Sequence, residues 1–314
     1  MARIYPVAFF DDRLIPVEQA TLSITSAAVL YGLSVYTVFP VTVALDGRAV
    51  AFRLADHYRR LTNSARIIGI DTFEPAWSEE RFFEAVAELV CANSLAEDVF
   101  VRASVHVVAQ LPGTRSRGMA TLLSMFACAA EPILPLDGVR LKTSVWRRIP
   151  DYAIPSRAKV NGAYVNSVLA KQDAIDSGYD DCIFLDAVGH VCELSAANIF
   201  LVRGGVLITP STASDLLEGI NRATVLQIAA DFGIPACERE VDLTELYIAD
   251  EVFACGTSTY IAPVVEVDAR TVNGSCLGPV TARIRERYLA VLRGENGAYE
   301  QYLTRFASKE ASRR

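Results

Sequence analysis

The chain has 314 residues, of which 52% are hydrophobic, and it carries a formal net charge of −7. The length allows two modest domains or one large one, and the hydrophobic fraction is ample for a packed core. The acidic balance argues against nucleic acid or an anionic membrane as a partner, because both favour a basic surface. No stretch reaches the roughly 18 uninterrupted apolar residues of a membrane span.

The counts of cysteine, histidine and lysine restrict the kinds of functional site that the chain could contain. The seven cysteines form no C-x-x-C pair and there are only three histidines, so we expect no metal site. An odd number of cysteines without a secretion signal indicates reduced thiols and predicts a cytoplasmic protein. Because only an amine forms Schiff bases, every lysine in this arginine-rich chain is a candidate for that chemistry. The lysines are Lys142, Lys159, Lys171 and Lys309.

The first half of the chain predicts a small α+β domain over residues 1–128. Hydrophobic periodicity predicts a helix over 55–68 and a second helix from the N-cap Ser78 to about Asn93. Asp46-Gly47 predicts a hairpin turn. The predicted strands are β-branched or aromatic runs over 3–10, 13–17, 34–44, 48–53, 99–109 and 119–128.

Two prolines and an Asp-Gly pair predict an interdomain linker over 129–138. A larger, β-rich domain with helices is expected over 139–314. Its strands are predicted over 140–147, 182–208 and 250–263, with a break at 255–258. Its helices are predicted from about 163 to 176, from Asn221 to Gly233, and over 279–293. The polar tail over 308–314 is expected to be frayed.

Lys159 and Glu193 are the first candidates for chemistry. Lys159 lies in a run of small residues before a predicted helix, where most lysines are ordinary surface residues. Glu193 ends a predicted strand between Cys192 and Leu194. If it is buried it needs a positive or proton-donating partner such as a protonated pyridine nitrogen, and otherwise it reaches solvent.

Other segments are candidates for binding anions. Gly219-Ile220-Asn221 opens a predicted helix, whose free N–H groups suit a phosphate, and glycine and hydroxyls follow a strand at 256–258. Arg59 and Arg60 suit phosphate binding or form a solvated helix face. On the strand over 100–107, Arg102 is a candidate carboxylate clamp or an edge residue that reaches solvent.

Several motifs in order resemble the branched-chain amino-acid aminotransferases of PLP fold type IV. They are IPSRAKVNGAYVNSVLA (154–170), GYDDCIFLDAVGHVCELSAANIFLV (178–202), LLEGINRATVLQIA (216–229) and LYIADEVFACGTSTYIAPV (246–264). The likeness includes AAVLYGLSVYTVF (27–39), FRLADHYRRLTNSA (52–65) and FVRASV (100–105). The resemblance implies a two-domain α+β fold of the D-amino-acid and branched-chain aminotransferase kind, pyridoxal 5′-phosphate (PLP) as cofactor, and a homodimer or higher homo-oligomer.

The resemblance also implies roles for residues. Lys159 resembles the catalytic Schiff-base lysine, which carries a proton between the substrate Cα and the cofactor C4′. Tyr164 resembles the tyrosine that bonds the cofactor O3′, and Glu193 resembles the carboxylate that keeps the pyridine nitrogen protonated. Asn198 belongs to the same strand motif as Glu193. The resemblance implies a phosphate site made of Arg59, Gly219, Ile220, Asn221, Gly256 and Thr257, with Asn221 in place of a common threonine.

The implied substrate pocket departs from the branched-chain pattern. Tyr36-Thr37-Val38-Phe39-Pro40 stands where ordinary branched-chain enzymes carry a Phe-x-Gly-x-Arg pattern. Its Tyr-x-Val part is similar to the (R)-selective amine transaminases, whereas Arg102 keeps the branched-chain arginine. Arg115 and Arg117 either reach a substrate carboxylate or face solvent. The implied pocket residues are Tyr31, Tyr36, Val38, Phe100, Arg102, Thr257 and Ser258.

The resemblance implies ping-pong transamination, through pyridoxamine 5′-phosphate, between a branched-chain L-amino acid and 2-oxoglutarate. The strand at Tyr36 leaves an alternative open, an (R)-amine or D-amino-acid transaminase that uses pyruvate. A PLP lyase of the aminodeoxychorismate-lyase kind shares the lysine and the glutamate. A PLP-binding relative without catalysis would be expected to lack one of them.

Overall fold

The computed structural model describes residues 2–43 and 48–306. The predicted turn at Asp46-Gly47 and the predicted tail over 308–314 lie outside these residues. The chain divides into two compact units. The first unit contains the chain up to Glu131, Ala158–Gly162 and the chain from Ala290 on, and the second contains Pro132–Arg157 and Ala163–Leu289.

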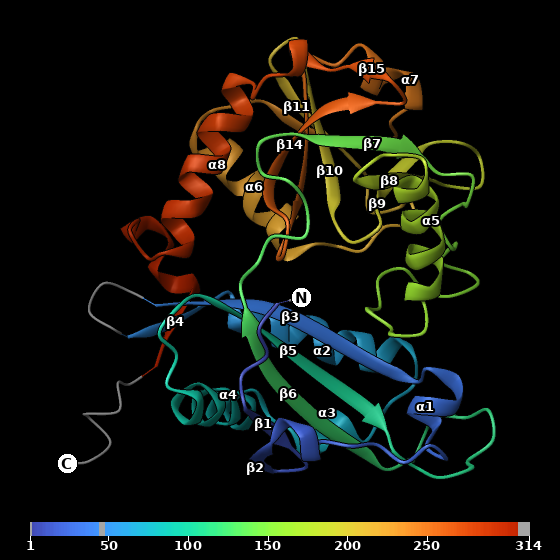
Figure 1. Cartoon of the computed structure of the whole chain (residues 1–314), viewed down its shortest axis with the longest axis vertical. Coiled ribbons are helices and arrows are strands. Elements are labelled where there is room, and N and C mark those ends of the chain that lie inside the picture. Colours follow the sequence, from blue (N-terminus) through green and yellow to red (C-terminus); the bar gives the residue numbers. More distant parts are fainter. Residues whose placement is uncertain (1, 44–47, 307–314) are drawn as a thin grey trace. The chain divides into compact units, whose positions relative to one another are not determined.

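The first unit is built on a seven-stranded sheet in the order β16-β4-β3-β5-β6-β1-β2, with antiparallel neighbours. Its strands are β1 (Val7–Phe10), β2 (Arg13–Pro16), β3 (Ser34–Val43), β4 (Ala49–Phe52), β5 (Val99–Val107), β6 (Thr121–Ala129) and β16 (Leu303–Arg305). Its helices are α1 (Ala27–Tyr31), α2 (Leu54–Ile67), α3 (Phe73–Ala76) and α4 (Glu79–Asn93). Helix α2 lies against β3, and α4 lies against β1 and β6 (Figure 1).

Helix α2 follows the predicted periodicity. Leu54, Tyr58, Leu61 and Ala65 are buried at spacings of three and four residues, which places one apolar face against the sheet. Tyr58 packs on Phe82 of α4 with 5.4 Å between ring centroids. The sequence of α2 therefore fixes which side chains point toward the sheet and which toward solvent.

A short segment of the first unit, Ala158–Gly162, runs along the first half of β3. Val160 forms an antiparallel bridge with Val35, and the N–H of Asn161 donates to the Ser34 carbonyl at 2.9 Å. Gly32, with φ of +64°, permits this approach, because a Cβ there would lie 2.9 Å from Gly162 Cα. Main-chain hydrogen bonds thus fix the segment that carries Lys159.

The second unit is built on a nine-stranded mixed sheet. Its path is β12-β11-β10-β13-β14-β7-β8-β9, and β15 pairs with β14. The strands are β7 (Val139–Thr143), β8 (Asp181–Leu185), β9 (Val191–Leu194), β10 (Asn198–Arg203), β11 (Val206–Pro210), β12 (Ala236–Arg239), β13 (Glu251–Gly256), β14 (Tyr260–Val267) and β15 (Arg270–Thr271). The helices are α5 (Tyr164–Asp176), α6 (Ile220–Asp231), α7 (Leu243–Tyr247) and most of α8 (Pro279–Leu292).

Most predicted elements match the structure, with two corrections. The predicted strand over 140–147 ends at Thr143. The second compact unit differs from the domain expected over 139–314 in two places. Residues 158–162 and the chain from Ala290 on belong to the first unit, because they add strands or bridges to its sheet at β3 and β4. Helices α1, α3 and α7 and strands β12 and β16 were not predicted, since each has five residues or fewer.

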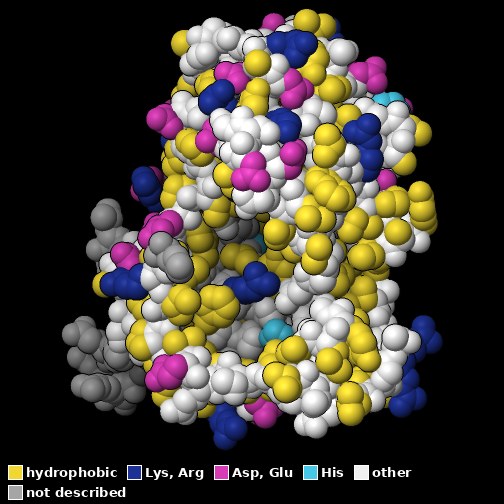
Figure 2. Space-filling model, turned by 45° about the vertical axis from the view of Figure 1, so that its right-hand side comes forward, with side chains coloured by type: hydrophobic (Ala, Val, Ile, Leu, Met, Phe, Trp, Pro, Cys, Tyr) yellow, Lys and Arg dark blue, Asp and Glu magenta, His cyan; other side chains and the backbone are white. Residues whose placement is uncertain are grey.

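Three further observations bear on the classes of site. All seven cysteines are free thiols. Within residues 2–43 and 48–306, no helix is both long and apolar enough to cross a membrane. Over the same residues, no group of three or more His, Cys, Asp and Glu side chains could hold a metal ion. On the face shown in Figure 2, acidic and basic side chains are interspersed.

Candidate active site

Lys159 is held rigidly although it lies outside helices and strands. Its N–H donates to Ser64 Oγ at 3.0 Å, and its carbonyl accepts from the N–H of Tyr36 at 3.0 Å. Its Nζ lies 4.9 Å from the centroid of the Tyr36 ring. The residue is half-buried. This placement differs from that of an ordinary surface lysine, whose backbone and side chain face solvent.

The two neighbouring arginines of α2 have opposite surroundings. The Arg59 side chain is 68% exposed and pairs with Asp56. Arg60 is half-buried, and its Nη2 donates to Thr37 Oγ1 at 3.0 Å. The structure therefore places Arg59, the predicted phosphate arginine, toward solvent, and it places Arg60 in a buried network near Lys159.

His57 completes this network. It is fully buried, and its Nδ1 lies 2.8 Å from Thr37 Oγ1. Burial lowers the pKa of His57 well below its ordinary value, and the charges of Arg60 and Lys159 lower it further. The imidazole in this network is therefore neutral.

The antiparallel register of β3 and β5 brings four predicted pocket residues onto one face of the sheet. Val38 pairs with Arg102, Pro40 pairs with Phe100, and Tyr36 lies two residues before Val38. The Cζ of Arg102 lies 3.6 Å from the centroid of the Tyr36 ring. Tyr31, at the end of α1, is 50% exposed and lies outside this sheet face.

In the second unit, Glu193 is buried at the end of β9, and its predicted alternative as a solvent-facing residue is wrong. Its Oε1 lies 2.9 Å from Arg148 Nη2. Its Oε2 accepts from Asn198 Nδ2 at 3.1 Å, and the N–H of Leu217 donates to the carboxylate at 3.2 Å. Three donors hold the carboxylate in one orientation, and Arg148, which sequence reasoning missed, supplies the opposite charge.

Helix α6 begins with the predicted phosphate residues. Gly219 is its N-cap, and a Cβ there would lie 2.0 Å from Asn198 Oδ1, so the position requires glycine. Asn221 is 3% exposed, and neither its Oδ1 nor its Nδ2 has a partner among the described residues. A buried amide without partners costs free energy, which a bound phosphate would recover by accepting from Nδ2 and from the free N–H groups of the helix. These residues therefore fit the phosphate of PLP.

The remaining predicted cofactor residues lie on elements of the second unit. Tyr164 is the first residue of α5 and is half-buried. Gly256 ends β13, and Thr257 and Ser258 form the turn to β14. Thr259 in the same turn has a buried hydroxyl without a partner among the described residues. The turn thus offers hydroxyl groups beside a glycine.

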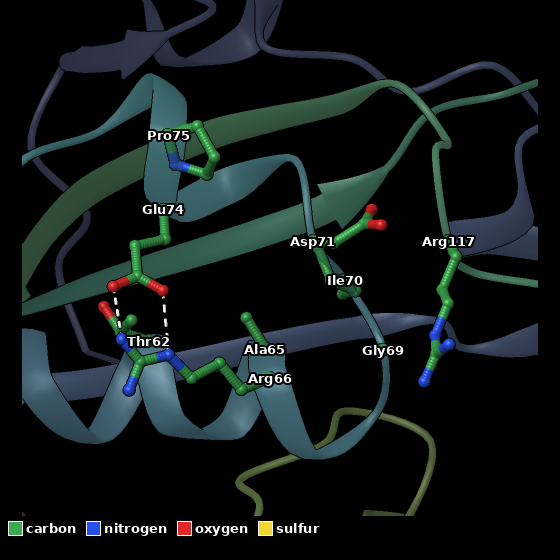
Figure 3. A pocket seen from close by; sticks show the side chains of 9 residues that line it. All are labelled: Thr62, Ala65, Arg66, Gly69, Ile70, Asp71, Glu74, Pro75 and Arg117. Carbon is green, nitrogen blue, oxygen red and sulfur yellow. Dashed lines mark hydrogen bonds and ion pairs between the residues drawn. The ribbon is translucent and has the colours of Figure 1, made fainter.

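A separate pocket of about 480 Å³ lies in the first unit (Figure 3). Arg117 lines it together with Arg66 and Glu74, which form an ion pair, and with Asp71. None of the predicted pocket residues lines it. Arg117 therefore lies away from the sheet face of Arg102, and Arg115 is exposed.

Comparisons with known proteins identify the family of the chain. The family described as "Amino-transferase class IV" matches residues 34–267. A probable branched-chain-amino-acid aminotransferase of Synechocystis sp. is 33% identical, with 96% of this chain and 98% of the relative covered.

Two solved structures are similar along nearly the whole chain. The branched-chain aminotransferase of Thermoproteus uzoniensis with norvaline has a TM-score of 0.91 and 36% identity, covering 97% of this chain and 99% of that one. The T.th. branched-chain amino acid aminotransferase with pyridoxamine 5′-phosphate has a TM-score of 0.88 and 34% identity, covering 96% and 98%. The predicted α+β fold type IV is confirmed. The chain belongs to the class IV aminotransferases, and it is a PLP-dependent aminotransferase.

Proposed function

We propose that this aminotransferase transfers the amino group of a branched-chain L-amino acid to 2-oxoglutarate. The observation that carries the proposal is the Tyr36 ring, over which both the Lys159 amine and the Arg102 guanidinium lie, at 4.9 and 3.6 Å from its centroid. A substrate carboxylate on Arg102 places the amino group of the same molecule close to Lys159. Val38 and Phe100, on the same sheet face, offer apolar contacts to a branched side chain.

Lys159 is proposed to move the proton at the substrate Cα. PLP, when bound, supplies an electron sink for the negative charge that develops on that carbon. Glu193 is proposed to keep the pyridine nitrogen protonated, because a fixed carboxylate stabilises a neighbouring positive charge. Tyr164 is proposed to bond O3′, and Asn198 orients Glu193 through the 3.1 Å hydrogen bond.

We assign the phosphate to the N-terminus of α6, to the turn after β13 and to Arg60. The buried, unpartnered amide of Asn221 supports the first assignment. Gly219, Ile220, Gly256 and Thr257 are the predicted companions. Arg60 replaces Arg59 in this role because Arg59 is exposed and already paired with Asp56.

A second candidate function is an (R)-amine or D-amino-acid transaminase that uses pyruvate. Tyr36 and Val38 favour it, because they form the Tyr-x-Val pattern in place of the branched-chain Phe-x-Gly. Phe100 favours it too, because it replaces a tyrosine of the branched-chain pattern. Thr257, Ser258 and Tyr31 are the other pocket residues that the resemblance implies. Because the relatives are named aminotransferases, a lyase and a non-catalytic PLP-binding protein are less favoured.

A single-turnover experiment separates these functions. The PLP form would be mixed with L-leucine, L-valine, L-glutamate, D-alanine or (R)-1-phenylethylamine, and the spectrum of the pyridoxamine form would be followed. Conversion by L-leucine and L-glutamate is the expected result. Conversion mainly by D-alanine or the (R)-amine would favour the second function, and release of pyruvate and 4-aminobenzoate from aminodeoxychorismate would favour the lyase.

We also propose that the enzyme is a cytoplasmic homodimer. Free thiols at all seven cysteines support a reducing compartment. Exposed apolar side chains gather on α5 and in the loop before it, on the side of the molecule that Figure 2 brings forward: Val145, Trp146, Tyr152, Val165 and Val168. Light scattering at two concentrations would test the dimer, and Val168→Glu is expected to yield monomers.

A further inference from the structure

Asn161 contacts Arg102, the arginine proposed to bind a substrate carboxylate. Arg102 Nη2 donates to Asn161 Oδ1 at 3.2 Å. The backbone of Asn161 is itself fixed, because its N–H donates to the Ser34 carbonyl at 2.9 Å and Val160 bridges Val35. The acceptor that Arg102 meets therefore has a defined position on the edge of β3.

A second contact restrains the same guanidinium. The Tyr36 ring lies 3.6 Å from Arg102 Cζ, so it covers one face of the guanidinium plane. Among the residues that the structure describes, no carboxylate forms an ion pair with Arg102, and Asn161 is the only side chain that accepts a hydrogen bond from it. Within residues 2–43 and 48–306, Arg102 is thus a restrained cation that forms no ion pair.

We propose that Asn161 is a positioning residue that orients Arg102 for a substrate carboxylate. This inference rests on the proposed function, in which Arg102 binds that carboxylate. An arginine that is already immobilised loses less rotational freedom when a ligand binds, so the carboxylate binds more tightly. Because Asn161 lies two residues after Lys159, the same backbone segment sets the positions of the guanidinium and of the amine.

The test measures carboxylate binding without turnover. PLP-loaded wild type, Asn161→Ala, Arg102→Met and the double variant would be titrated with 4-methylvalerate, a monocarboxylate without an amine, by the absorbance of the bound cofactor. Asn63→Ala, a change at an exposed asparagine of α2, is the matched control. We expect Asn161→Ala to raise Kd about three- to tenfold, the cost of immobilising one flexible side chain when the ligand binds.

Two further measurements distinguish positioning from a general structural role. The KM for L-leucine is expected to rise by the same factor as Kd while kcat stays within about twofold, because only binding is weakened. In the Arg102→Met background, Asn161→Ala is expected to have no further effect. Asn161→Asp, which keeps the side-chain size, is expected to weaken carboxylate binding as well, because it neutralises Arg102.

Several outcomes would overturn the inference. They are an unchanged Kd for 4-methylvalerate in Asn161→Ala, or tighter binding of 4-methylvalerate in Asn161→Asp. A third is that Asn161→Ala weakens binding by the same factor in the Arg102→Met background as in wild type. A wild-type enzyme that transfers no amino group would instead contradict the proposed function. A wild type that reacts with L-leucine while Asn161→Ala keeps its Kd contradicts only the positioning role.

Discussion

Arg148 and Glu193 form a buried ion pair, with 2.9 Å between Nη2 and Oε1. Their side chains are 13% and 7% exposed. Arg148 also lies over the Phe184 ring, and its backbone N–H donates to the Leu185 carbonyl. The Arg148 guanidinium offsets the cost of burying the Glu193 carboxylate, which would be large for an isolated charge. A carboxylate that must face a protonated pyridine needs such a partner before the cofactor arrives.

Replacing Arg148 with methionine is therefore expected to destabilise the protein without PLP by about 3 to 5 kcal/mol, because Glu193 is left as an unpaired buried charge. Urea unfolding of the protein without PLP measures this loss. Arg148→Lys, which keeps the charge, is expected to lose less. Equal stability of Arg148→Met and wild type would show that the Arg148–Glu193 pair does not stabilise the protein without PLP.

Asn221→Ala is expected to weaken PLP binding about 10- to 100-fold, the range for a lost hydrogen bond to a charged group. The stability of the protein without PLP should stay within about 1 kcal/mol of wild type, because the amide has no partner among the described residues to lose. PLP titration and urea unfolding measure the two effects. Asn221→Thr, which keeps a donor, should bind PLP nearly as wild type does. A loss of stability in Asn221→Ala without a loss of PLP affinity would contradict the assignment.

Two adjacent arginines provide a matched comparison. Arg60→Ala is expected to weaken PLP binding by at least about tenfold, because a guanidinium–phosphate pair is lost. Arg59→Ala is expected to change it by less than about twofold, because exposed pairs such as Arg59 with Asp56 contribute little. Titration of both variants with PLP measures the difference. A larger effect at Arg59 would restore the arginine first predicted from the sequence.

One buried histidine, His57, and one half-buried histidine, His106, predict how stability depends on pH. Burial lowers the pKa of His106 to about 4, and it lowers the pKa of His57 well below its ordinary value. The unfolded chain then binds these protons first, so their contribution is fully present above about pH 6.5 and is lost as the pH falls toward 4. His106→Gln is expected to lose about 2 kcal/mol less than wild type between about pH 7 and pH 5, in urea unfolding at each pH. A parallel decline of the two proteins would contradict the shift.

The periodicity of helix α2 distinguishes the surroundings of Arg59 from those of Arg60. Arg60 lies three residues after His57 and four before Ser64, both of which are buried. Arg59 lies about 100° further round the helix, between the exposed residues Ala55 and Asn63. The choice between the two arginines could therefore have been made from the sequence. The resemblance supplied Lys159 and Glu193, which neither spacing nor composition singles out.

Other parts of the site depend on contacts between distant residues, which no local pattern reveals. Arg148 and Glu193 are separated by 45 positions, and Arg102 and Asn161 by 59. The strand pairing of β16 with β4 likewise joins opposite ends of the chain. Sequence periodicity predicts which side of a helix or strand is buried, but it does not identify the distant residue that packs against that side.

Amino transfer from isotope-labelled L-leucine to 2-oxoglutarate, compared between wild type and Lys159→Ala, tests the central claim most directly. Labelled L-glutamate is expected from wild type, and none above the uncatalysed background from a Lys159→Ala protein that folds and still binds PLP. Labelled product from Lys159→Ala at the wild-type rate, or none from wild type with any L-amino acid, would contradict that claim.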